Sequence, residues 1–169
     1  MWHPILFRSM MKITILCVGK IKEKYLRDGI GEYTKRLSRY CKLDFIEVPD
    51  EKTPDGASET TELQIKKIEG DKLLKYMKDG DYVIALAIDG KMLDSVEFAR
   101  KMETLGIQGV GHVIFVIGGS LGLSGDVLQR ADYKLSFSKM TFPHQLMRMV
   151  LLEQIYRGYR INTNSPYHK

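Results

Sequence analysis

The chain has 169 residues, a length that fits one domain with its own hydrophobic core. Hydrophobic residues make up 44% and charged residues 28% of the sequence, which excludes a disordered or fibrous protein. The net charge of +5 favours an anionic partner without proving one. The two cysteines, Cys17 and Cys41, have no metal-ligand spacing, so we expect a reduced, cytoplasmic setting and no metal.

The first ten residues read MWHPILFRSM and differ in character from the rest of the chain. They contain a short apolar patch but no small-residue cleavage site, so we do not expect a secretory signal peptide. The chain from Met11 enters a strand-like run directly. We therefore interpret residues 1–10 as an extension outside the fold and residues 11–169 as a single domain.

The first half of this domain predicts two strand–helix units. Lys12–Val18 is rich in β-branched residues, and Lys22–Tyr40 then repeats apolar side chains at helical spacing. Leu43–Val48 alternates as a strand. Glu59–Met77 predicts a polar helix, in which Gly70 is a weak point because glycine disfavours helix interiors.

The second half predicts three more strands. Tyr82–Ile88 and His112–Ile117 are continuous apolar runs typical of buried strands, and Tyr133–Ser136 is a shorter one. Between the first two, Asp94 and Glu97 have the spacing of a capping box at the start of a helix.

Two helices complete the pattern. A short one is expected from about Ser124 to Arg130, after the glycine-rich turn Gly118–Gly122. The last is entered through Pro143 and runs to about Ile161. Its surface is apolar nearly all round, which indicates either the central core helix of a monomer or a helix with one side against a second subunit.

Strands and helices thus alternate, which predicts an α/β fold with a mostly parallel sheet and helices on both faces. Ligands of such sheets bind at the carboxyl ends of the strands. This points to three loops, at Asp89–Lys91, Gly118–Gly122 and Phe137–Phe142.

The glycine-rich segment reads GGSLGLSG and matches neither common phosphate-binding glycine motif. It also comes after the fourth strand, whereas a classical dinucleotide fold places its glycine loop after the first. It is therefore either a loop that a ligand approaches closely or a simple tight turn.

The segment from Ser136 to Arg148 reads SFSKMTFPHQLMR and leads into the last helix. A helix N-terminus favours anions and offers free N–H groups. His144 stands there as a base, as an RNA contact or as an ordinary surface residue. The chain end, Asn164–Lys169, is by composition an inert terminus.

Taken together, three segments resemble a known family: VIGGSLGLSGDVL, LSFSKMTFPHQLMRMVLLEQIYR and the final YHK. The chain is similar to the ribosomal large-subunit RNA methyltransferase H family, which belongs to the SPOUT class. The resemblance covers Met11 to Lys169.

The resemblance implies a SPOUT fold with a carboxyl-terminal trefoil knot, which general topology rules would disfavour. It implies a homodimer that uses S-adenosyl-L-methionine and needs no metal. It further implies methylation at N3 of a pseudouridine in helix 69 of 23S ribosomal RNA on the assembled ribosome.

The resemblance also implies site residues. Those matching cofactor contacts are Leu86, Gly118, Phe137, Ser138, Lys139, Met140, Thr141 and Phe142. Those matching the active site or an RNA contact are His144, Arg148, Tyr167 and His168. Two alternatives remain: a nucleotide-binding enzyme built on the glycine loop, which would lack the usual P-loop lysine, and a non-catalytic ribosome-binding factor.

Overall fold

The computed structural model describes residues 10–169. Residues 1–9 lie outside the described residues. The expectation that residues 1–10 form an extension therefore stays a prediction. The division into an extension and one domain stays a prediction with it.

Strands and helices alternate along the described chain in the predicted order. They are β1 (Lys12–Val18), α1 (Lys24–Leu37), β2 (Lys42–Val48), α2 (Glu59–Leu74), β3 (Tyr82–Met92), α3 (Ser95–Ile107), β4 (His112–Ile117), α4 (Gly125–Arg130), β5 (Tyr133–Ser136) and α5 (His144–Asn162). The strands β1, β4 and β5 have the bounds that the sequence predicts. Pro143 is the N-cap of α5 rather than its first helical residue.

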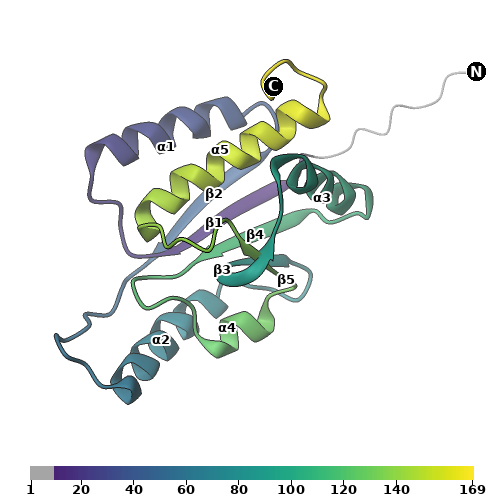
Figure 1. Cartoon of the computed structure of the whole chain (residues 1–169). Helices are drawn as coiled ribbons and strands as arrows, with labels where there is room; N and C mark the ends of the chain where they lie inside the picture. Colours follow the sequence, from purple (N-terminus) through teal and green to yellow (C-terminus); the bar gives the residue numbers. More distant parts are fainter. Residues whose placement is uncertain (1–9) are drawn as a thin grey trace, which may run out of the picture.

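The strands form one five-stranded sheet in the order β2-β1-β4-β3-β5, and every neighbouring pair is parallel. Helices α1, α3 and α5 cover one face, and α2 and α4 cover the other (Figure 1). The α/β class with a parallel sheet covered on both faces is therefore confirmed. Because all strands run the same way, their carboxyl ends meet along one edge.

Two cores result from the alternation of side chains along the strands. In β1, Ile13, Ile15 and Cys17 join the core beneath α1, α3 and α5, while Leu16 and Val18 join the core beneath α2 and α4. All five side chains are buried. Burying one such aliphatic side chain contributes about 1.5–3 kcal/mol, so both helical layers are held by the same strand.

Helix starts agree with the capping chemistry in the sequence. Asp94 accepts from the Glu97 N–H at 2.7 Å, and Glu97 accepts from the Asp94 N–H at 3.0 Å, which confirms the capping box. The weak point expected at Gly70 does not interrupt α2. A Cβ there would collide with the side chain of Ser124, the N-cap of α4, so glycine permits the close contact of α2 and α4.

The loop predicted at Asp89–Lys91 is wrong, because β3 continues through these residues to Met92. The strand is irregular there: its pairing with β5 shifts register between Leu86 and Lys91. A Cβ at Gly90 would lie 2.8 Å from backbone atoms of Lys134, so glycine allows the two backbones to approach. An apolar run alone could not reveal this polar continuation of the strand.

Helix α5 lies between α1 and α3 (Figure 1). Met149 packs against Gly29 of α1, and Gly158 packs against Phe98 and Ala99 of α3. No residue of α5 is fully exposed. Packing within one chain thus explains much of its apolar character, and the trefoil knot stays a prediction of the resemblance.

Candidate active site

A cavity of about 760 Å³ lies at the edge of the sheet where the strands end. Small-molecule sites in proteins have volumes of about 300–1,000 Å³. Three segments line most of it: the later part of β3 (86–89), the glycine loop and its continuation (117–123), and the segment from β5 to the start of α5 (135–144). Two of the three predicted loops therefore border one cavity, and the third border is strand rather than loop.

The glycine loop forms a tight turn beside this cavity. The Gly122 N–H donates to the Gly119 carbonyl at 3.1 Å, and Gly122 has φ +85°, a conformation that favours glycine. A Cβ at Gly118 would lie 2.7 Å from the carbonyl carbon of Gly122. The loop therefore has space for hydrogen but not for a side chain at Gly118.

Serine hydroxyls shape the loop after β5. The Ser136 hydroxyl lies 3.0 Å from the Ile88 carbonyl and 3.1 Å from the Ser138 carbonyl and can donate to either. The Ser138 hydroxyl accepts from the Met140 N–H at 3.0 Å. These bonds tie the loop to β3 and bend it around the cavity.

The structure brings most of the expected cofactor residues together. The residues that line the cavity are Leu86, Gly118, Phe137, Ser138, Met140, Thr141 and Phe142. Lys139 belongs to the same loop but does not line the cavity. Met140 is 75% exposed and Phe142 40% exposed, so the cavity has an apolar rim open to solvent.

His144 lines the same cavity at the start of α5. Burial lowers the pKa of its imidazole, and the nearby Arg148 guanidinium lowers it further. The ordinary histidine pKa is about 6.5, so the side chain is neutral near pH 7. A neutral imidazole at this position can accept a proton.

Arg148 lies one turn further along α5 and is only 1% exposed. It donates to Glu47 at 2.8 Å and to the carbonyls of Val18 and Gly19 at 2.9 and 2.8 Å. Glu47 also accepts from the Ile21 N–H at 3.1 Å. In this placement Arg148 holds the turn after β1 against α5, and its role in the active site or as an RNA contact, which the resemblance implies, stays a prediction.

The tail after α5 is folded back on the helix. The Tyr167 hydroxyl donates to Glu153 at 3.0 Å, and its ring meets the ring of Tyr156 edge-on at 5.0 Å. Arg157 lies 4.7 Å from the centre of the Tyr167 ring and 3.2 Å from Nδ1 of His168. The chain end therefore makes specific side-chain contacts, unlike the inert terminus that composition alone indicates.

The tail follows the carboxyl-terminal end of α5 (Figure 1), whereas the cavity is lined by His144 and Met147 in the first turns of that helix. Tyr167 packs on Tyr156, and about 18 Å of helix separates Tyr156 from His144 at a rise of about 1.5 Å per residue. Within one chain, the structure thus brings His144 to the cavity but not Tyr167 or His168.

Sequence reasoning missed the partners of these residues. Glu153 and Arg157 form an ion pair at 2.8 Å and hold the tail. Their spacing of one helical turn was a signal that could have found them. Glu47 is far from Arg148 in sequence, and no local pattern indicates that pair.

Two kinds of feature are absent from the described part of the chain. Among residues 10–169, no group of His, Cys, Asp or Glu is arranged to hold a metal ion. No helix in the same range is both long and apolar enough to cross a membrane.

The profile of a family described as "Predicted SPOUT methyltransferase" matches residues 11–168. This chain belongs to the SPOUT methyltransferase family. The chain is also similar to a solved structure described as "The structure of a probable methylase family protein from Haemophilus influenzae Rd KW20". The TM-score is 0.50 at 13% identity, and the match covers 94% of this chain and 70% of that one. This similarity bears on the fold alone.

Relatives in other bacteria are much more similar. Proteins named "Ribosomal RNA large subunit methyltransferase H" from Bifidobacterium adolescentis, Clostridium novyi and Clostridium tetani are 62%, 64% and 64% identical to it over 159 residues. Each alignment covers 94% of this chain and the whole of the relative. The family resemblance noted in the sequence is confirmed, and the two alternative functions are not supported.

The methyl donor of this family is S-adenosylmethionine, and the cavity fits such a ligand. Its size suits a nucleoside carrying an amino-acid tail. The close approach at Gly118 leaves backbone rather than side chain facing the space. The lining mixes apolar side chains with hydroxyls, as sites for small organic ligands do.

Proposed function

We propose that this chain methylates N3 of a pseudouridine in helix 69 of 23S ribosomal RNA, with S-adenosylmethionine as the methyl donor. The observation that carries the proposal is identity of 60–64% to relatives named as large-subunit ribosomal RNA methyltransferases, over their entire lengths. The cavity at the strand ends is the part of the chain that suits the chemistry.

The proposed cofactor contacts are Leu86, Gly118 and the loop Phe137–Phe142. When bound, the cofactor supplies a methyl group that its sulfonium centre already activates. The work left to the chain is alignment of the acceptor and exclusion of water. The apolar rim at Met140 and Phe142 suits the second task, because it borders the cavity with side chains that do not hydrogen-bond water.

His144 is the proposed base. N3 of pseudouridine carries a proton that must leave when the nitrogen is methylated. The lowered pKa of His144 keeps its ring nitrogen free to take that proton near neutral pH. Arg148, which lowers this pKa, then assists by position and charge rather than by touching the RNA.

The proposed substrate is the assembled ribosome rather than free RNA. The chain carries a net charge of +5 but no separate RNA-reading module, so its own contact area on RNA is small. Neighbouring ribosomal surfaces can supply the missing affinity by holding the target in place. A cytoplasmic location agrees with this substrate.

The proposed active unit is a homodimer in which one subunit's tail completes the cavity of its partner. Tyr167 and His168 fold back on α5 near Tyr156, about 18 Å of helix from His144 of their own cavity. A two-fold axis can bring the tail of one subunit to the cavity of the other. In this arrangement the tail can contribute Tyr167 and His168 to an active site, which it does not do within one chain.

The test is methyl transfer from labelled S-adenosylmethionine to purified ribosomes, to free 23S RNA and to a short helix 69 hairpin. We expect the label on ribosomes, at one pseudouridine located by fragment mass spectrometry, and much slower transfer to the hairpin. Label at a different base would refute the target. Equal rates on the hairpin and the ribosome would refute the requirement for assembly.

A further inference from the structure

Glu69 is a carboxylate that the proposed chemistry does not use, yet it is only 5% exposed. It lies on α2, on the face of the sheet opposite α5. Burying a charged side chain is costly unless its contacts compensate. The contacts of Glu69 reach two segments that are far apart in the sequence.

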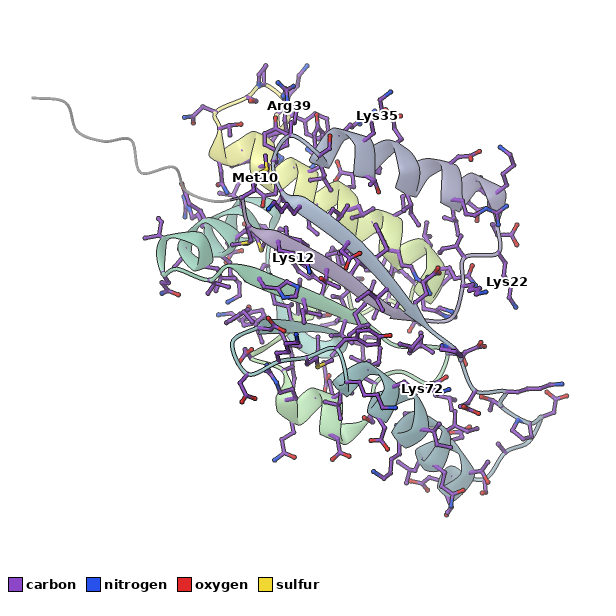
Figure 2. The ribbon with its side chains drawn as sticks, turned by 180° about the vertical axis from the view of Figure 1, so that it is seen from behind. Met10, Lys12, Lys22, Lys35, Arg39 and Lys72 are labelled. Carbon is purple, nitrogen blue, oxygen red and sulfur yellow. The ribbon has the colours of Figure 1, made fainter. Side chains whose placement is uncertain are left out.

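The first segment is the loop after β2. Glu69 accepts a hydrogen bond from the Glu51 N–H at 3.0 Å. Lys72, one turn further along α2, donates to the Pro49 carbonyl at 3.2 Å and to the Glu51 carboxylate at 2.7 Å. Figure 2 shows Lys72 on α2 beside the point where the chain leaves β2. These bonds fix the loop on α2.

The second segment is the glycine loop beside the cavity. A Cβ at Gly119 would lie 3.4 and 3.5 Å from the two carboxylate oxygens of Glu69, and 3.2 Å from Val18. The next residue, Gly70, packs directly against Ser124. Two consecutive residues of α2 therefore lie beside the two ends of the segment from Gly119 to Ser124, and Gly119–Leu123 of this segment line the cavity.

We propose that Glu69 is a positioning residue for the cofactor cavity: its carboxylate, held by the Glu51 N–H, supports the glycine loop from behind at Gly119. Burial raises the pKa of this carboxyl group, and the hydrogen bond from the Glu51 N–H opposes that rise. The inference rests on the cofactor cavity of the proposed function and not on the RNA target.

The expected consequence concerns cofactor affinity. If the glycine loop is already held in its bound conformation, no free energy is lost in ordering it when the ligand binds. If the loop is loosened, it must be ordered on binding, and the affinity falls. Removal of the support should therefore raise the Kd for S-adenosylmethionine. The turnover rate at saturating cofactor should change little, because Glu69 does not line the cavity.

The test is calorimetric titration of S-adenosylmethionine into the full chain and its variants, without RNA. Glu69→Ala should raise Kd about tenfold, the effect of losing one buried hydrogen-bonding group. Glu69→Gln keeps a carbonyl oxygen that can accept from the Glu51 N–H, so its Kd should stay within about threefold of the parent. Asp71→Ala is the matched control, because it removes an exposed carboxylate from the same helix.

The outcomes separate cleanly. Unchanged affinity of a folded Glu69→Ala protein would overturn the inference, as would a tenfold loss in the Asp71 control. If the alanine variant does not fold, Glu69→Asp is the variant to measure. It keeps the charge, but its side chain is too short to reach from Glu51 to Gly119. Wild-type affinity of that variant for S-adenosylmethionine would also overturn the inference. Absence of binding by the unsubstituted chain would instead refute the cofactor cavity itself.

Discussion

Gly118 borders the cavity at a point where the backbone itself leaves no room for a side chain. A Cβ there would lie 2.7 Å from the carbonyl carbon and 2.9 Å from the carbonyl oxygen of Gly122. Backbone atoms cannot turn aside as a flexible side chain can. Any substitution must therefore displace the glycine loop that borders the cavity.

We expect Gly118→Ala to weaken S-adenosylmethionine binding by about 100-fold or more, since a shifted loop loses several ligand contacts at once. Gly125→Ala is the control, because a Cβ at Gly125 meets nothing within 4 Å. Calorimetry measures both, and circular dichroism checks the fold. Equal affinity of the two variants would show that Gly118 does not border the cofactor.

His144 gives a prediction in pH. Because burial and Arg148 lower its pKa, the neutral base persists below the ordinary histidine value of about 6.5. We expect kcat to stay level from pH 8 to about 6.5 and to fall only at more acidic pH, where the imidazole is protonated.

His144→Gln should lower kcat by about 100-fold or more and remove this acidic limb, with little change in cofactor Kd. Single-turnover rates across the pH range measure both effects. A variant that retains the limb would assign the proton acceptor to another group.

The sequence predicted these residues because strand ends, glycines and a helix start are local features. It could not predict that Arg148 is buried, because its partners Glu47, Val18 and Gly19 come from other elements. It also could not separate Lys139 from its neighbours in the loop, since lining a cavity depends on how the loop bends.

At the scale of elements, the Arg148–Glu47 pair joins α5 to the carboxyl ends of β1 and β2. Arg148 is buried, whereas the Glu47 side chain is 36% exposed, so solvent screens part of the attraction. The carbonyls of Val18 and Gly19 would nevertheless lose their guanidinium donors if Arg148 were removed.

We expect Arg148→Met to lower the free energy of unfolding by about 2–3 kcal/mol, because buried hydrogen-bond acceptors lose their partner. Lys24→Met breaks an exposed ion pair with Asp28 and should change it by less than about 0.5 kcal/mol. Urea denaturation followed by circular dichroism measures the difference. Equal stability of the two variants would contradict the structural role of Arg148.

The order of elements was predictable because buried strands and amphipathic helices have different periods. The continuation of β3 to Met92 was not, since polar residues such as Asp89 and Lys91 resemble a loop in sequence. Apolar residues around α5 predicted burial on several sides, but only the structure identifies α1 and α3 as its neighbours.

At the scale of the whole molecule, the start of α5 borders the cavity, and the tail leaves the other end of the helix (Figure 1) and folds back on it through Tyr167. Glu153 and Arg157 of α5 hold the tail against its own helix, through Tyr167 and His168. In the proposed homodimer, the tail of one subunit completes the cavity of its partner.

Two inactive variants test this claim when they are mixed. One lacks Tyr167–Lys169, and the other carries Gly118→Val in the glycine loop. In a mixed dimer, the intact cavity of the first subunit meets the intact tail of the second. After random exchange of subunits, we expect about a quarter of the wild-type methylation of ribosomes, because half of the dimers then carry one complete site of two.

The measurement is the initial rate of label transfer from S-adenosylmethionine to ribosomes, for each variant alone and for the mixture after subunit exchange. We expect near-zero rates for each variant alone and recovery in the mixture. If each cavity used its own tail, every mixed dimer would carry a defect in both sites. A mixture as inactive as its components, or full activity of the tail deletion by itself, would show that the tail does not complete the partner's cavity.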